Sequence, residues 1–111
     1  MNALHIRKAK TFTDLQQVYR LTHDAFVAAG LCDKQSHNMI IHHPDQDVIP
    51  ETIIYMVEIE DELVGTVTFT IDSEFGLMVD EGFKQQVDKY RKFYGKVANF
   101  WRLAILPAYQ N

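Results

Sequence analysis

The sequence predicts one α+β domain of the three-layer α/β type, with flanking helices and a sheet that is mixed but mainly antiparallel. Residues 53–59 are apolar on both faces, and residues 63–71 alternate strictly after a short polar turn, which is typical of a β-hairpin. Residues 15–29 instead carry apolar side chains at helical spacing. The expected order is strand, helix, long loop, strand, strand, helix and strand.

Composition and charge disfavour several classes of protein. Of the 111 residues, 47% are apolar and 23% are charged, as in a folded globular domain. The formal net charge of −4 argues against a nucleic-acid partner. No apolar run approaches the roughly 20 residues that span a bilayer, and the N-terminus does not resemble a signal peptide. We therefore expect a cytoplasmic protein with no membrane span.

The first two elements have clear local signals. Residues 4–9 are predicted to form a short strand. The following helix is expected to begin near Thr11 or Thr13, either of which can cap it, and Thr13 has Gln16 three residues on, as in a capping box. Gly30 is a plausible end. The helix stripe that should face the core consists of Leu15, Val18, Tyr19, Thr22, Phe26 and Ala29.

Residues 31–51 are polar and predict a long loop with room for one helical turn, and loops of this length are often functional. Histidines 37, 42 and 43 fit no standard metal site, so we expect exposed loop histidines and no metal. Cys32 has no partner for an internal disulfide and no neighbouring base that would make it a nucleophile.

A second helix is expected to start at Asp80 as its N-cap and to end at Gly95. Residues 97–106 then form a last strand that Pro107 closes. Strict alternation along this strand would place Trp101 and Leu103 on one face and Phe100 and Ala104 on the other. The apolar stripe of the second helix, which we expect to be buried, consists of Val79, Phe83, Val87, Tyr90 and Tyr94.

Two segments carry a resemblance to a known superfamily. Residues 100–109 read F-W-R-L-A-I-L-P-A-Y and resemble the R-L-A-V-x-P-x-Y strand of GNAT acyltransferases. Residues 65–81 read G-T-V-T-F-T-I-D-S-E-F-G-L-M-V-D-E and look like the G-T-x-T-x-x-x-D-S-x-x-G-L-P-x-D segment of the N-acyl amino acid synthase (FeeM-type) branch. The resemblance extends over residues 4–110 and implies a GNAT-like fold.

The resemblance implies an N-acyltransferase that moves an acyl group from a thioester donor to the amine of an amino acid or similar small molecule. The donor would be carried by acyl carrier protein or coenzyme A, as a substrate rather than a tightly bound cofactor. An N-acetyltransferase that uses acetyl-CoA is one alternative. A truncated, non-catalytic fragment or binding module that self-associates is another.

In the superfamily, the last strand leads into a Q/R-x-x-G-x-G/A loop, whose backbone N–H groups bind the pyrophosphate of the donor. Gln110 would be the first residue of that loop, and the sequence stops at the next residue. We therefore expect residues 1–111 to form a single, incomplete acyltransferase domain that is truncated after its fourth strand. Such a chain should bind coenzyme A or acyl carrier protein weakly or not at all.

The resemblance also suggests site residues. Arg102 would pair with a substrate carboxylate or with Asp72, while the alternative is a solvent-facing residue or a structural ion pair. Asp72 and Asp80 would line the acceptor side, unless they only end a strand and cap a helix. Asn99 stands where relatives often have a glutamate, Trp101 replaces a small residue, and Met78 replaces a proline. The backbone N–H groups of Leu103, Ala104 and Ile105 would bind the thioester carbonyl.

Aromatic side chains allow two further expectations. Phe69, Phe75, Phe100 and Trp101 either wall a tunnel for the acyl chain or belong to the core. The last strand is apolar on both sides and should be covered on both. We therefore expect a homo-oligomer in which this strand lies at the contact, with Trp101 or Phe100 near a two-fold axis.

Overall fold

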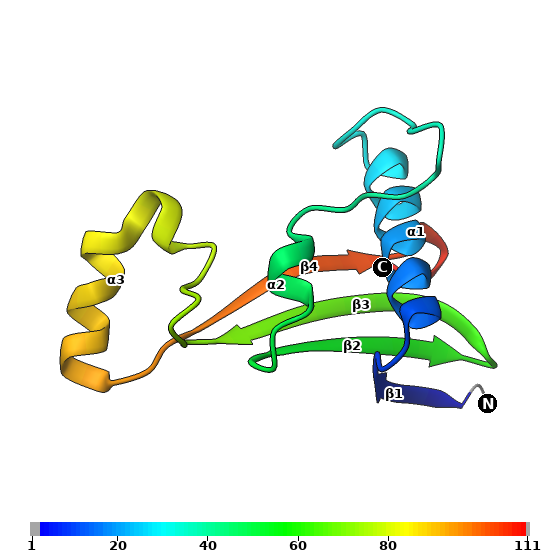
Figure 1. The fold of residues 1–111 in the computed structure, drawn as a ribbon. Helices are drawn as coiled ribbons and strands as arrows, with labels where there is room; N and C mark the ends of the chain where they lie inside the picture. Colours follow the sequence, from blue (N-terminus) through cyan, green and yellow to red (C-terminus); the bar gives the residue numbers. More distant parts are fainter. Residues whose placement is uncertain (1–2, 111) are drawn as a thin grey trace.

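The computed structural model describes residues 3–110 and contains one four-stranded sheet in the order β1-β2-β3-β4 (Figure 1). All three pairings are antiparallel. The prediction of a mainly antiparallel sheet is therefore confirmed, and no parallel pairing occurs within residues 3–110. The predicted order of elements is confirmed, with a short α2 in the long loop. The elements are β1 (Leu4–Lys8), α1 (Phe12–Ala28), α2 (Pro44–Asp47), β2 (Thr52–Ile59), β3 (Glu62–Ile71), α3 (Asp80–Tyr94), β4 (Ala98–Ile105) and the 3-10 helix η1 (Pro107–Tyr109).

The predicted hairpin joins β2 and β3 through a two-residue turn, because Ile59 pairs directly with Glu62. Glu60 and Asp61 both have positive φ, at 51° and 66°. This is the backbone of a type I′ turn, whose twist matches that of the flanking strands. The hairpin makes β2 a central strand, with β3 on one edge and β1 on the other. Of its two apolar faces, the one that carries Ile54 and Met56 is buried.

Helix α1 is capped by Thr11, and the alternative start at Thr13 is wrong because Thr13 lies inside the helix. The Thr11 hydroxyl accepts a hydrogen bond from the backbone N–H of Asp14 at 3.0 Å, and the Asp14 carboxylate accepts one from the Thr11 N–H at 3.3 Å. Two hydrogen bonds from Arg7 hold the pKa of Asp14 well below its usual range. Gly30, at φ 73°, follows the helix end as predicted.

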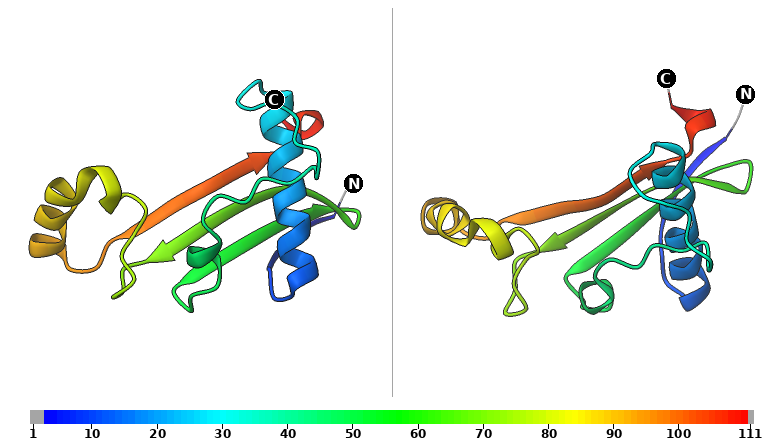
Figure 2. Two further views of the ribbon diagram at one scale, coloured as in Figure 1. Left: turned by 45° about the horizontal axis from the view of Figure 1, so that its top comes forward. Right: turned by 90° about the horizontal axis from the view of Figure 1, so that it is seen from above.

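Helices α1 and α2 lie on the same face of the sheet (Figures 1 and 2), and the core forms between them and the strands. Its centre consists of Val18 from α1 and of Ile54 and Met56 from β2. The buried face of β3 is its threonine face, comprising Thr66, Thr68 and Thr70. A buried hydroxyl needs a partner, and each of these three has one from β2 or β4.

No described helix packs on the opposite face of the sheet, where Leu4, Ile6, Phe100 and Leu103 are exposed. Phe100 is 69% exposed, whereas Trp101 is only 8% exposed because it points toward α2. The expectation that Trp101 could lie at a contact between copies is therefore not compatible with its position. A homo-oligomer through Phe100 and this face stays a prediction.

The expected burial of α3 is wrong. None of its residues is buried, and Phe83, from the middle of the predicted stripe, is 60% exposed. The reason is topological: β3 and β4 pair up to Ile71 and Ala98, and the chain leaves and returns at the same end of the sheet. Helix α3 consequently lies beyond the strand ends, not over a face (Figure 1), and its backbone is kinked at Phe83.

Candidate active site

Strand β4 contains a β-bulge that the sequence did not predict. Thr66 pairs with Ala104 and Thr68 pairs with Trp101, so two residues of β4, Arg102 and Leu103, lie opposite the single Val67. Arg102 has a φ of 49°, a left-handed conformation that costs an ordinary residue on the order of 1–3 kcal/mol. The expected strict alternation is therefore wrong, since the side chains of both Trp101 and Arg102 are buried and that of Leu103 is exposed.

The buried Arg102 guanidinium forms a bidentate ion pair with Asp47 of α2. Its Nη1 and Nη2 atoms lie 3.0 and 2.9 Å from the two carboxylate oxygens, and both side chains are 0% exposed. Nη2 also donates to the Thr68 hydroxyl at 2.6 Å, and the Tyr19 hydroxyl donates to Asp47 at 2.7 Å. Of the alternatives for Arg102, the pair with Asp72 is wrong, and the structural ion pair is the arrangement present.

Aromatic rings enclose this ion pair. The Arg102 guanidinium carbon lies 4.6 Å from the centre of the Trp101 ring and 5.7 Å from that of Tyr19. The Trp101 indole N–H donates to Thr70 at 3.0 Å, and His43 contacts the same ring edge-on. Among residues 3–110, the buried Nε of Arg102 has no hydrogen-bond partner. The Nη1 and Nη2 atoms of Arg102 do have hydrogen-bond partners, which a charged group buried away from water needs.

The four aromatics proposed for an acyl-chain tunnel do not form one wall. Phe69 and Phe100 contact each other at 4.8 Å between ring centres on the face opposite α1. Trp101 points to the other face, and Phe75 is exposed in the loop between β3 and α3. The described residues therefore do not assemble the tunnel that the aromatic content suggested.

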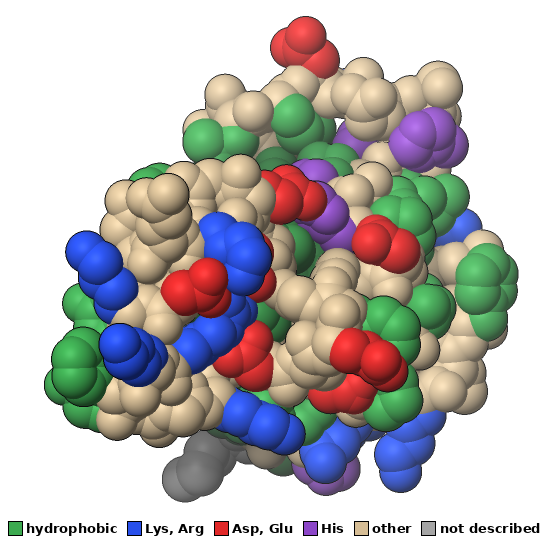
Figure 3. Space-filling model, turned by 60° about the vertical axis from the view of Figure 1, so that its left-hand side comes forward, with side chains coloured by type: hydrophobic (Ala, Val, Ile, Leu, Met, Phe, Trp, Pro, Cys, Tyr) green, Lys and Arg blue, Asp and Glu red, His purple; other side chains and the backbone are tan. Residues whose placement is uncertain are grey.

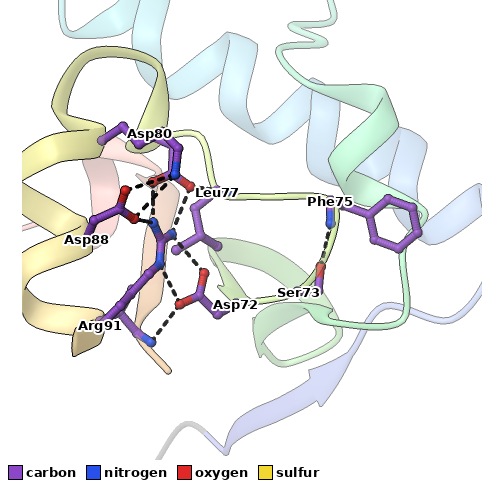
Figure 4. A network of polar contacts seen from close by, with 9 residues as sticks. Asp72, Ser73, Phe75, Leu77, Asp80, Asp88 and Arg91 are labelled. Carbon is purple, nitrogen blue, oxygen red and sulfur yellow. Dashed lines mark hydrogen bonds and ion pairs between the residues drawn. The ribbon is translucent and has the colours of Figure 1, made fainter. Parts of the chain in front are cut away.

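Asp72 and Asp80 belong to a second cluster, around Arg91 of α3 (Figure 4). Arg91 donates to Asp72 at 2.8 Å, to Asp80 at 2.7 Å and to Asp88 at 2.8 Å. The Val97 backbone N–H adds a bond to Asp72 at 3.0 Å. By strand geometry this cluster lies about 16 Å along β4 from Arg102, so the structure does not bring Asp72 and Arg102 together.

The segment from Asp72 to Asp80 connects β3 to this cluster. Gly76 adopts a φ of 72°, and the Leu77 backbone N–H donates to the Asp80 carboxylate at 2.9 Å. The expectation that Asp80 is the N-cap of α3 is wrong, because Val79 precedes it with helical dihedral angles. Asp80 instead holds the preceding turn. A cavity of about 740 Å³ lies here, lined among others by Phe75, Lys84 and Lys96.

Hydrogen bonds from Arg91 are the main cause of the lowered pKa values of Asp72, Asp80 and Asp88. All three carboxylates therefore stay ionised near neutral pH. A carboxylate whose charged form is stabilised in this way is a poor proton acceptor. The arrangement suits the attachment of α3 to the sheet better than removal of a proton from a substrate.

The remaining predicted site residues lie along β4 and just after it. Asn99 donates its side-chain N–H to the Phe100 carbonyl at 3.3 Å, and Ala104 is buried under α1 while Ile105 is exposed. Gln110 donates its side-chain N–H to the Ile105 carbonyl at 2.7 Å. Among the described residues, β4 has a neighbouring strand on one side only, so the other backbone edge of 103–105 is open.

The loop between α1 and β2 supplied the site residue that the sequence analysis missed, Asp47. The only available signal was its place in a long polar loop, since its partner is 55 residues away.

The histidines of the same loop, which the structure describes, show no sign of a metal site. Burial is the main cause of a lowered pKa at His42. No group of three possible metal ligands occurs within residues 3–110. Over the same residues, no helix has the length and apolar character needed to cross a membrane.

Comparison with protein families adds a decisive observation: residues 17–111 match the family described as FeeM, N-acyl amino acid synthase FeeM. The chain belongs to this family. A solved structure titled "The structure of FeeM, an N-acyl amino acid synthase from uncultured soil microbes" superposes with a TM-score of 0.79 at 15% sequence identity, and the match covers 97% of this chain. The chain spans 56% of the length of that FeeM structure. Comparison with curated proteins gave no match.

Membership of the FeeM family and the superposition confirm the GNAT-like α+β fold predicted from the two sequence segments. Both segments lie inside the matched range, and the structure shows what each one builds. Residues 65–81 form β3 and the turn that meets Arg91. Residues 100–109 form the bulged strand and the 3-10 turn after it.

The Arg91 cluster predicts a specific dependence of stability on pH. The folded-state pKa values of Asp72 and Asp80 lie below their ordinary value of 3.8, so their stabilisation is present above pH 3.8 and is lost as the pH falls through the folded values. Replacing Arg91 with Gln should remove the larger part of this difference, since the backbone hydrogen bonds from Val97 and Leu77 remain, and about 2 kcal/mol of stability at pH 7. Thermal unfolding between pH 2 and 7 measures both effects.

The matched control is Arg20→Gln, because Arg20 is exposed and makes no ion pair within the described residues. That variant should keep the acid sensitivity of the parent protein. An Arg91→Gln variant whose unfolding temperature follows the same pH curve as the parent would show that the cluster does not form.

Proposed function

We propose that this protein is an N-acyltransferase that transfers an acyl group from a thioester donor to the amine of an amino acid or a similar small molecule. Membership of the FeeM family supports this proposal at the level of the reaction. The observation that supports β4 as the place of the reaction is the bulge at Arg102 and Leu103, on a strand with an open backbone edge.

The proposed reaction is a direct attack. The lone pair of the amine adds to the thioester carbonyl carbon, and the carbonyl oxygen becomes an oxyanion. The resemblance to GNAT enzymes suggests that this oxygen is bound by a backbone N–H group among Leu103, Ala104 and Ile105, one that points to the open edge of β4. A preorganised N–H group stabilises the oxyanion more than the neutral carbonyl. The intermediate collapses when the carbon–sulfur bond breaks, which leaves an amide and a thiolate.

The amine loses one proton and the thiolate gains one. Asp72 and Asp80 are poor acceptors for this proton because Arg91 lowers their pKa values. Asn99 is an amide and cannot accept it. We therefore assign the proton transfer to water, and the protein accelerates the reaction by orientation and by oxyanion stabilisation. Arg102 is bound by Asp47, so its proposed role is structural and not that of a ligand for the acceptor's carboxylate.

A donor and acceptor screen tests the proposal. The protein is incubated with acetyl, decanoyl and palmitoyl thioesters, each on coenzyme A and on acyl carrier protein, together with a mixture of amino acids. The donors are used at high concentration, because residues 1–111 are expected to bind them weakly. Because the resemblance to the N-acyl amino acid synthase branch implies a long-chain donor, mass spectrometry should find N-acyl amino acids that contain the decanoyl or palmitoyl group. Acetylated products alone would indicate a small-molecule N-acetyltransferase, and thioester loss without any amide would contradict the proposal.

A further inference from the structure

The ion pair beneath the bulge has a consequence for the proposed reaction. We propose that Asp47 is a positioning residue for acyl transfer, because it holds Arg102 in the left-handed conformation that sets the direction of the backbone N–H groups of residues 103–105. The inference rests on the proposed function, in which an N–H group among these, at the open edge of β4, binds the oxyanion. It adds a residue from α2, far along the chain from β4.

The first step concerns the faces of β4. In a regular strand, neighbouring side chains point to opposite faces, so Trp101 and Arg102 could not both lie under α1 and α2. Both are buried on that face, and the bulge is what permits it. The contact between Arg102 and Asp47 therefore depends on the bulge, and the bulge is stabilised in turn by the contact.

The second step concerns how firmly Asp47 is held. One carboxylate oxygen accepts a hydrogen bond from Arg102 at 2.9 Å, and the other accepts one from Arg102 at 3.0 Å and one from Tyr19 at 2.7 Å. Tyr19 belongs to α1, Asp47 to α2 and Arg102 to β4. The carboxylate thus fixes the left-handed residue relative to the two helices as well as to the sheet.

The third step concerns the position of the bulge relative to the open edge. Leu103 follows Arg102 directly, and its side chain points away from the helices. If the ion pair is lost, Arg102 can relax toward a regular strand conformation, and the peptide groups after it rotate. Reaction rates are sensitive to such changes, because a displacement of about 1 Å can lower them by roughly 100-fold.

The test compares Asp47→Asn and Tyr19→Phe with the matched control Asp45→Asn, whose side chain is exposed in the same short helix. With palmitoyl-CoA or palmitoyl carrier protein as donor, Asp47→Asn should lower kcat about 10- to 100-fold and change each KM less than about 3-fold. Tyr19→Phe should lower kcat to a smaller extent. The backbone amide signals of residues 103–105 should shift in NMR spectra of both variants and stay in place in the control.

Two results would overturn the inference. One is a folded Asp47→Asn variant with unchanged kcat, and the other is a lowered kcat with unmoved amide signals at residues 103–105. If Asp47→Asn does not fold, Tyr19→Phe decides by the same two readouts. Absence of acyl transfer by the parent protein from every donor counts against the proposed function instead, and the amide signals still test whether Asp47 holds the bulge.

Discussion

Replacing Asp47 with Ala should destabilise the protein by about 3–5 kcal/mol, since removing one partner of a buried ion pair leaves the other charge uncompensated. The side chains of Asp47 and Arg102 are both fully buried, so water cannot replace the lost carboxylate. A domain of this size has a stability on the order of 5–10 kcal/mol, so the change removes a large part of it. Urea unfolding monitored by tryptophan fluorescence measures the effect, because Trp101 lies against the Arg102 guanidinium.

Two further variants make this prediction specific. Asp45→Ala removes an exposed carboxylate from the same short helix and should change stability by less than about 0.5 kcal/mol. The double variant Asp47→Leu with Arg102→Met replaces both charges by apolar groups and should recover much of the loss. A cost below about 1 kcal/mol for Asp47→Ala would mean that Arg102 is not buried against it.

Replacing Met56 with Ala should cost about 2–5 kcal/mol, because it creates a cavity at the centre of the core. Met56 is 0% exposed and packs with Val18 and Ile54 between α1 and the sheet. The urea midpoint should fall while the slope of the transition stays the same. Val48→Ala, at a side chain that is 75% exposed, is the control and should leave the midpoint almost unchanged. Equal effects of the two substitutions would contradict this location of the core.

The hairpin, the first helix and the last strand could be predicted because their signals are local. Strict alternation of apolar and polar residues in 63–71, next to a polar turn, indicates a strand of a hairpin. The apolar stripe around Val18 indicates a helix with one face buried against the core. The prediction failed for α3 because an amphipathic pattern shows that a helix has an apolar face but not what covers it. Viewed from the side of α3, charged side chains of both signs gather around the helix (Figure 3). Phe93 and Tyr94 of this helix are exposed.

The candidate site was predicted only in part. The two sequence segments indicated the right family and drew attention to Arg102. Each segment is a local pattern, made by one strand and the turn that follows it, so it can be read from the sequence. The partner of Arg102 was missed since it lies 55 residues away, in a loop without periodicity. The bulge was missed for a different reason. It depends on a left-handed arginine, a conformation that is common for glycine and that no local pattern at Arg102 indicates.

The way in which the chain leaves and re-enters the sheet has an evolutionary consequence. The Asp72 backbone N–H donates to the Val97 carbonyl at 2.9 Å, so the two ends of the excursion that contains α3 are neighbours. A segment with adjoining ends can be lengthened, shortened or exchanged for a tight turn while the register of β3 and β4 is preserved. Related proteins can therefore diversify what stands at this end of the sheet independently of the bulge, and selection can act on the two regions separately.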